Sequence, residues 1–242
     1  MLAAVYAVLL YVATAVFLGG LAVRVWQYAS TPNPLKIVTT PAPTTAAGVC
    51  LRLVREVAVF ESLFKANKWI WLFGWTFHAA LLVVVLRHLR YFTQPVWEWV
   101  ALIQPLGVHA GFVMLASLLA LWARRLVVAR IRYISTPSDH LMLALLIAIA
   151  ASGLAMKYAA PTDIVALKSF VLGLIYLDWQ PLPADPPVLV HLGLVAVLMI
   201  VFPFSKLVHG PALLFSPTRA QVDDARERRH LVAWARALAS ER

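Results

Sequence analysis

The chain has 242 residues, of which 62% are hydrophobic and 13% charged, and its mean hydropathy is +0.81. This composition excludes an ordinary soluble domain, in which about 25% of residues are charged. The single cysteine, Cys50, excludes an intrachain disulfide and a covalent Cys-x-x-Cys-His haem attachment site.

Five segments are long and apolar enough to cross a bilayer, whose hydrocarbon core is about 30 Å thick. They lie at about residues 2–23, 69–92, 100–123, 140–157 and 187–208. The second contains Arg87 and Arg90, which lie close enough to its end to reach the interface. We therefore predict an all-α, polytopic membrane protein in which residues 1–242 form a single domain with five transmembrane helices.

The distribution of basic residues predicts the orientation of the spans. With the N-terminus outside and the C-terminus cytoplasmic, 17 of the 21 lysines and arginines lie on the cytoplasmic side. The positive-inside rule favours this topology, with a cytoplasmic loop at 24–68 and a cytoplasmic tail at 210–242. The net charge of +10 is then a topology signal. We expect no nucleic-acid partner, because the basic segments lack a recognisable nucleic-acid-binding fold.

The first loop holds a Pro/Thr-rich linker at 30–45, followed by a predicted amphipathic helix at 48–66. The apolar side of that helix comprises Leu51, Val54, Val57, Phe60 and Leu63. A second charged helix is predicted at 223–236 in the tail. Two interpretations of these surfaces stay open, which are docking of a soluble partner and contact with lipid.

The segments around the fourth span have their own signals. Pro137-Ser138-Asp139 marks the start of that span, with Ser138 as the predicted helix cap. The apolar run at 169–177 is too short to span a bilayer and is predicted to lie at the interface. Four prolines at 179–187 predict an extended loop.

Four histidines lie in or at the ends of the second and last spans. His78 and His88 are ten residues apart, and His191 and His209 are eighteen apart. Polar side chains at bilayer depth usually serve a function. Two pairs on two spans suit two b-type haem groups, each held from both sides.

If the two spans are antiparallel neighbours, His88 pairs with His191 and His78 with His209. The two sites would then be separated by about 15 Å along one helix and about 27 Å along the other. Tilt and a kink at Pro203 would absorb part of this mismatch.

Other chemistries lack their motifs. The sequence has no His-Glu-x-x-His, Walker or dinucleotide-binding pattern. The spans contain no acidic residue, which disfavours a proton-coupled transporter. Electron transfer is therefore favoured. The alternative is a transporter or scaffold without haem, whose histidines bind a transition metal or only pack.

Several motifs resemble a known family. They are the stretch 202–209 with its final His209, Phe77-His78 followed by His88, His191 eighteen residues before His209, and Arg124-Arg125-Leu126. Together they resemble the gamma subunit of respiratory nitrate reductase over all five spans. Residues 60–65 and 86–92 are more similar to cytochrome b subunits that serve iron–sulfur proteins of the heterodisulfide-reductase type. The sulfite-reduction-associated membrane complex of sulfur-metabolising prokaryotes contains one such subunit.

The resemblance implies a dihaem cytochrome b in a prokaryotic inner membrane. It implies that His88 and His191 hold an outer haem, and that His78 and His209 hold an inner one. Electrons would pass between a menaquinone or ubiquinone pool and a cytoplasmic iron–sulfur partner, within a complex that has other membrane subunits. Dissimilatory sulfur metabolism is the implied setting, with a nitrate reductase as the alternative, and the direction of electron flow stays open.

The resemblance also bears on four polar residues. In nitrate reductases a lysine near the start of the third span helps to bind quinol. The nearest match here is His109, with Gln104 upstream, and a merely interfacial histidine is the alternative. Arg87 and Arg90 flank His88 and suit haem propionates, because guanidinium forks match carboxylates. Anchoring of the span is the competing role for both arginines.

Overall fold

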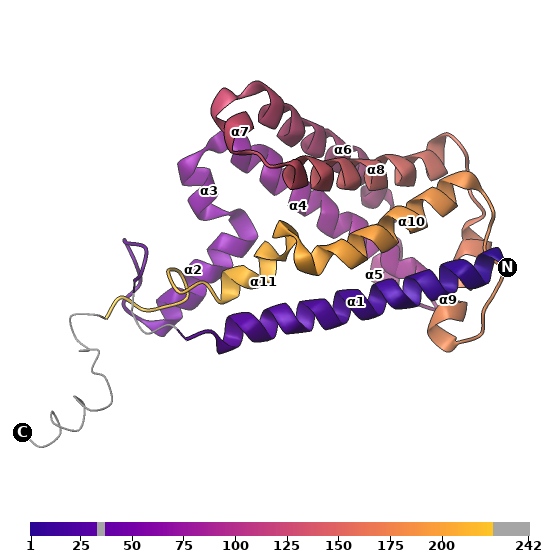
Figure 1. Ribbon diagram of the computed structural model, residues 1–242, viewed down its shortest axis with the longest axis horizontal. Coiled ribbons are helices and arrows are strands. Elements are labelled where there is room, and N and C mark those ends of the chain that lie inside the picture. The colour runs from indigo at the N-terminus through magenta and orange to yellow at the C-terminus, as the bar shows by residue number, and fades with distance from the viewer. Residues whose placement is uncertain (33–36, 225–242) are drawn as a thin grey trace, which may run out of the picture.

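The computed structural model describes residues 1–32 and 37–224, and all regular structure in these residues is helical. Five long helices follow the long axis of the molecule (Figure 1), and they are α1 (Leu2–Ser30), α4 (Lys68–His88), α6 (Gln104–Val127), α8 (Pro137–Tyr158) and α10 (Pro186–Val201). Short 3-10 turns extend α4 (η1, Leu89–Tyr91) and α10 (η2, Phe202–Phe204). With these turns, all five are long and apolar enough to cross a membrane. The predicted all-α fold with five spans is confirmed.

Shorter helices lie at the two ends of the bundle. One end, which we call the basic end, holds α2 (Ala46–Val59), α3 (Glu61–Ala66), α7 (Ala129–Ile134) and α11 (His209–Leu214). The opposite end holds α5 (Glu98–Leu102), α9 (Ile164–Tyr176) and the N-terminus (Figure 1). The basic end is the one that the sequence assigns to the cytoplasm.

Helix α9 replaces the predicted interfacial run at 169–177. It starts earlier, at Ile164, because the Asp163 side chain accepts hydrogen bonds from the backbone nitrogens of Val165 and Ala166 at 2.9 and 3.0 Å. At about 1.5 Å per residue, its 13 residues reach about 20 Å, which is still too short to span a bilayer.

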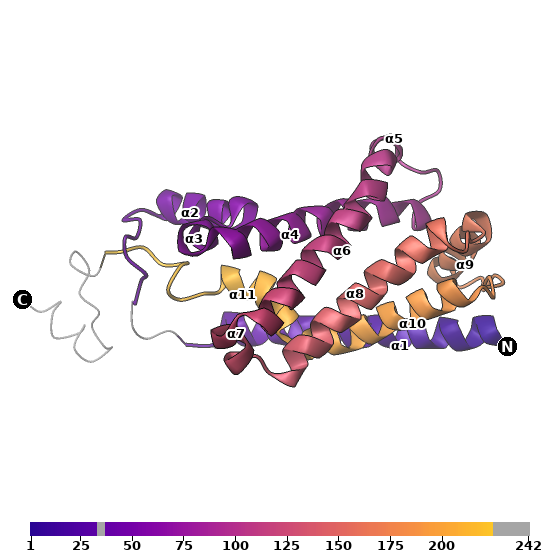
Figure 2. The ribbon, with the colours of Figure 1, turned by 90° about the horizontal axis from the view of Figure 1, so that it is seen from above.

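The long helices pack in the order α4, α6, α8, α10, α1. Figure 2 shows α4 on one side of the molecule and α1 with α10 on the other, while α6 crosses between them. The buried core at the α4–α6–α8 contact consists of Phe77, Ala80, Ala110, Met114, Leu118 and Ala150. Among the described residues, α4 and α10 form no extensive direct helix contact.

The last span, predicted over 187–208 with a kink at Pro203, is broken at that residue and beyond it. Helix α10 ends at Val201, and η2 is followed by an extended Ser205 (φ −106°, ψ 172°) and by η3 (Lys206–Val208). Pro203 has no backbone N–H to continue the helix. The carbonyl of Pro203 accepts a hydrogen bond from Arg24 Nε at 3.0 Å. This bond accommodates a cation in α1, which runs to Ser30 rather than to the predicted residue 23.

Two further boundaries differ from the prediction. The third span divides at Ile103 into α5 and α6, because Pro105 sits in the first turn of α6 and starts a new helix. The predicted helix at 48–66 divides at Phe60 into α2 and α3. The predicted charged helix at 223–236 lies outside the described residues from 225 onward.

The predicted cap at Ser138 is wrong. Thr136 is the N-cap of α8, and the Asp139 carboxylate accepts from the backbone nitrogen of Thr136 at 2.9 Å, which completes a capping box. Asp139 also accepts from Lys206 Nζ at 2.8 Å. One carboxylate therefore ties the start of α8 to the broken segment of the last span.

Candidate functional site

The four histidines of the second and last spans meet in two pairs. The ring centroids of His88 and His191 are 6.5 Å apart, and the planes of the two rings differ by 15°. The centroids of His78 and His209 are 5.8 Å apart, with planes at 87°. The structure thus brings together the residues that the antiparallel arrangement predicted. It does so although α4 and α10 belong to opposite sides of the molecule in Figure 2.

These separations suit one metal ion between each pair. With metal–nitrogen bonds of about 2 Å and a ring nitrogen roughly 1.1 Å from its centroid, two imidazoles on opposite sides of one metal have centroids about 6 Å apart. Both observed separations lie close to this value. Each pair could therefore take one metal ion, such as the iron of a haem, between its two rings.

In three of the four histidines, the ring nitrogen Nδ1 makes a hydrogen bond to a backbone carbonyl. Nδ1 of His78, His88 and His209 lies 2.7, 2.6 and 3.0 Å from the carbonyl oxygens of Gly74, Val84 and Lys206. A carbonyl oxygen only accepts, so each Nδ1 donates and each neutral ring keeps the lone pair of Nε2 free. Histidines that ligate metals usually have this arrangement.

His191 reaches the same state through a serine. Its Nδ1 lies 3.0 Å from the hydroxyl oxygen of Ser152, and that hydroxyl donates to the carbonyl of Ile149, also at 3.0 Å. Because the only hydroxyl hydrogen is committed to Ile149, Nδ1 of His191 donates and its Nε2 is free. Sequence reasoning missed Ser152, although a serine beside a glycine in an apolar span was a signal.

The glycine beside that serine gives His191 its place. A Cβ at Gly153 would lie 3.2 Å from Cε1 of His191 and 3.6 Å from its Nδ1. The absence of a side chain at position 153 therefore lets the α10 imidazole pack directly against the α8 backbone.

Each pair offers two protein ligands and no more. Within residues 1–32 and 37–224, no group of three or more His, Cys, Asp or Glu side chains could hold a metal ion. A structural zinc site takes four protein ligands. Two opposed imidazoles are the set that a haem needs, because the porphyrin supplies the other four nitrogens.

Arg87 and Arg90 converge on Gln104 at the opposite end from the basic one. The carbonyl oxygen of the Gln104 side chain accepts from Arg87 Nε at 3.0 Å and from Arg90 Nη1 at 3.1 Å. Gly107 makes room for this arrangement, since a Cβ there would collide with the Arg87 side chain. A role of the two arginines toward haem propionates remains a prediction.

The two residues predicted to bind quinone are placed differently from one another. Gln104 is half-buried and held by the arginines, whereas His109, five residues further along α6, is exposed. The role of either residue in binding quinone stays a prediction. The structure does not join the two residues by a hydrogen bond within its described part.

His140 has a partner that the sequence did not predict. Its Nδ1 accepts from the indole nitrogen of Trp122 at 3.0 Å. In a neutral imidazole only one nitrogen has a free lone pair, and in His140 that lone pair already accepts the hydrogen bond from Trp122. His140 therefore ties α6 to α8 and does not join the four paired histidines. His230 lies outside the described residues.

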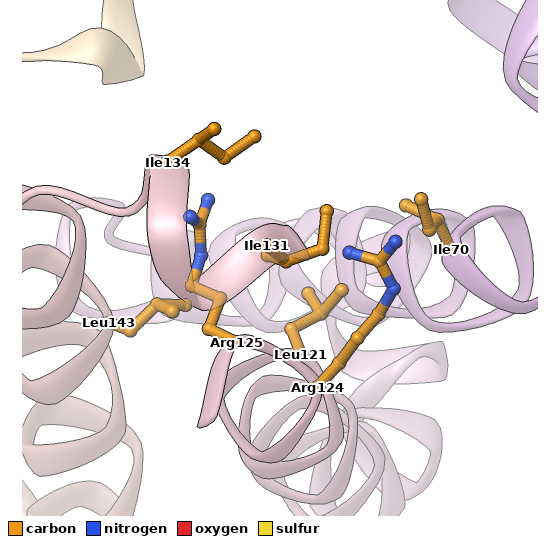
Figure 3. Close-up of a pocket in the computed structure, with 7 residues that line it drawn as sticks. All are labelled: Ile70, Leu121, Arg124, Arg125, Ile131, Ile134 and Leu143. Carbon is orange, nitrogen blue, oxygen red and sulfur yellow. The ribbon is translucent and has the colours of Figure 1, made fainter. Parts of the chain in front are cut away.

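A separate small cavity of about 240 Å³ lies at the basic end (Figure 3). Arg124 and Arg125 extend into it from the last turn of α6, and five aliphatic side chains complete its wall, namely Ile70, Leu121, Ile131, Ile134 and Leu143. Arg125 donates to the Ser135 hydroxyl at 3.0 Å. None of the paired histidines lines this cavity.

Comparison with known proteins agrees with this architecture. Residues 60–222 match the family of nitrate reductase gamma subunits. The chain is 34% identical over 269 residues to the cytochrome b-like subunit of an Hdr-like menaquinol oxidoreductase from Archaeoglobus fulgidus, covering 93% of this chain and 81% of the relative. It is 33% identical over 275 residues to the like-named subunit from Archaeoglobus profundus, with coverage of 93% and 80%.

The five spans and these similarities define a membrane cytochrome b-like subunit of the kind that transfers electrons to or from quinone. The chain belongs to the nitrate reductase gamma subunit family. The resemblance drawn from the histidine motifs is thus confirmed.

Proposed function

We propose that this chain is a dihaem cytochrome b subunit that passes electrons across the membrane between menaquinone and a cytoplasmic iron–sulfur partner. The observation that carries the proposal is the geometry of the two histidine pairs. In each pair the ring centroids are separated by the distance expected for two imidazoles that share one metal ion, and all four Nε2 atoms are free. The names of the two relatives, Hdr-like menaquinol oxidoreductase subunits, support menaquinone and a partner of the heterodisulfide-reductase type.

Haem, when bound, supplies reversible one-electron chemistry, and the protein supplies its surroundings. His88 and His191 would hold the haem at the opposite end, and His78 and His209 the haem at the basic end. The carbonyls and the Ser152 hydroxyl behind the imidazoles fix the ring orientations and raise the basicity of the ligating nitrogens. The apolar spans exclude water and ions between the two sites.

The direct test is the haem content of the purified chain. A pyridine haemochrome assay should give about two b-type haems per chain, with absorbance typical of low-spin bis-histidine iron. Adding a menaquinol analogue should reduce them. Pure membrane protein that holds a transition metal but no haem, after expression with adequate haem, would favour the alternative of a transporter or scaffold.

The residues that contact quinone can be tested by the same reduction of the haems with a menaquinol analogue. We propose that His109 hydrogen-bonds the quinone and that Gln104 orders the site through its bonds to Arg87 and Arg90. Histidine can donate to a quinone carbonyl and can exchange a proton near neutral pH. In a His109→Leu chain that keeps both haems, reduction by the menaquinol analogue should slow, and an unchanged rate would remove His109 from the site.

The identity of the soluble partner distinguishes the two branches of the family to which this chain could belong. We propose dissimilatory sulfur metabolism as the setting, because the resemblance at residues 60–65 and 86–92 and the Hdr-like relatives point to the same branch. Co-purification from native membranes should recover an iron–sulfur subunit. Recovery of a molybdenum enzyme instead would assign the chain to a nitrate reductase.

The orientation can be tested with the single cysteine. Cys50 is exposed on α2 at the basic end. If that end is cytoplasmic, a membrane-impermeant maleimide should label Cys50 in inside-out vesicles and not in right-side-out ones. The control is Val165→Cys in a Cys50→Ala background, since Val165 is exposed on α9 and should give the reverse pattern. Labelling of Cys50 from the outside would invert the proposed topology.

A further inference from the structure

We infer that Phe60 is a positioning residue whose ring sets the plane of the His78 imidazole. The inference rests on the proposed function, in which His78 is an axial ligand of the haem at the basic end. It concerns a residue outside the spans, at the junction of α2 and α3, with no ligating atom of its own.

The contacts around His78 restrict how its ring can turn. The Phe60 ring meets the imidazole edge to face, with centroids 5.0 Å apart and planes at 79°. Phe77, which precedes His78, meets it in a similar way at 4.9 Å and 75°. The hydrogen bond from Nδ1 to the Gly74 carbonyl directs the ring but does not by itself fix the rotation of the ring about the Cβ–Cγ bond of His78. The aromatic contacts oppose that rotation.

The backbone of Phe60 is in an unfavourable conformation. Its φ of 51° and ψ of 48° are left-handed, a region that bulky residues seldom adopt. Among the described non-glycine residues, Phe60 shares a positive φ with Leu177 alone. Both residues end a helix, Leu177 at the end of α9 and Phe60 at the end of α2. At Phe60 a second helix, α3, begins without an intervening loop, and the turn presents the ring to His78.

Two tryptophans of α4 hold this turn from one side. The indole nitrogen of Trp71 donates to the carbonyl of Val59 at 2.7 Å, and that of Trp75 donates to the carbonyl of Ala58 at 2.9 Å. These are end carbonyls of α2, which lack partners within the helix. The span that carries His78 thus also holds the residues that precede Phe60.

An ion-pair cluster holds the turn from the other side. Glu56 in α2 hydrogen-bonds the hydroxyl and the backbone nitrogen of Ser62 in α3. Arg219, from the segment after the last span, reaches Glu56 at 2.7 Å and the Ser62 hydroxyl at 2.6 Å. A strained residue persists when its surroundings over-determine it, and such residues gather at functional sites. The turn at Phe60 meets that description.

The two histidine pairs differ in the property that Phe60 controls. Parallel imidazole planes split the two dπ orbitals of a ferric haem iron, because both ligands donate into the same orbital. Perpendicular planes leave the two orbitals nearly equal in energy. The His88–His191 site, with planes at 15°, should therefore give a rhombic low-spin electron paramagnetic resonance signal. The His78–His209 site, with planes at 87°, should give a single strong low-field feature.

The test compares four variants by this spectrum and by haem content. In Phe60→Leu, which lacks the ring, the low-field feature should move toward the rhombic signal while both haems stay bound. Phe60→Tyr keeps the ring and should retain the low-field feature. Phe73→Leu is the matched control, because the Phe73 ring packs on Trp69 at the same end of α4 and makes no ring contact with the described residues that hold the turn. Phe60→Gly guards against misfolding, since glycine adopts a positive φ without strain. It should behave as Phe60→Leu does.

Each outcome has one meaning. Loss of the low-field feature in Phe60→Leu and Phe60→Gly, with Phe60→Tyr and Phe73→Leu unchanged, supports the positioning role. Two haems with an unaltered spectrum in Phe60→Leu would overturn it and leave the proposed function intact. Absence of haem from the unmodified chain would overturn the proposed function and this inference together.

Discussion

Replacing either His78 or His209 with alanine is expected to leave one haem per chain where the unmodified protein holds two. The two rings are 5.8 Å apart and offer the only protein ligands that the described structure gives to that site. Changes behind a metal ligand already cost about 10- to 100-fold in affinity. Loss of the ligand itself should therefore empty the site, and haem absorbance should fall by about half.

The measurement is a pyridine haemochrome assay on each purified variant, with His140→Ala as the control. His140 also lies on a spanning helix, but its Nδ1 accepts from Trp122 and it pairs with no other histidine in the described residues. That variant should keep both haems. If His78→Ala or His209→Ala retained two haems per chain, the pairing drawn from the structure would be wrong.

Introducing a branched side chain at Gly153 is expected to remove the other haem. A Cβ at this position already lies 3.2 Å from Cε1 of His191, closer than ordinary van der Waals contact. The two methyl groups of Gly153→Val would have to displace the imidazole or push α8 away from α10. Either movement takes Nε2 of His191 out of line with His88. One haem per chain should remain, held by His78 and His209.

Gly19→Val provides the matched control for this substitution. Gly19 also lies in a spanning helix, and a Cβ there meets nothing within 4 Å. The control should keep both haems and a thermal unfolding midpoint close to that of the unmodified protein. The low-field paramagnetic signal identifies which haem survives in Gly153→Val. Survival of the rhombic signal alone would contradict the assignment of His191 to that site.

Much of the membrane architecture could be read from the sequence because hydropathy acts locally. A run of apolar residues must be buried in lipid or in protein wherever it lies in the fold, so five spans followed from composition and length. The positions of four histidines within two of these spans were visible in the same way. Their separations of ten and eighteen residues gave the order in which they would meet.

Helix breaks were harder to predict because they depend on partners distant in the chain. Pro203 predicted a kink in the last span. The break continues through Ser205, and the carbonyl of Pro203 that it leaves without a helical partner accepts a hydrogen bond from Arg24, a residue of α1. The division of the predicted helix at Phe60 could not be predicted locally, because no glycine or proline lies near Phe60 in the sequence. It depends on Trp71, Trp75 and Arg219, which hold that turn by hydrogen bonds and an ion pair.

The sequence by itself determined the class of this protein, since apolar spans, their basic flanks and the histidine spacing are properties of single segments. Only the tertiary structure decided the distance and the plane angle within each imidazole pair, and the hydrogen bond from His191 Nδ1 to Ser152 that leaves His191 Nε2 free. The reason is physical. Each of these features joins residues on different helices, and the relative placement of helices follows from side-chain packing along their whole contact rather than from any one segment.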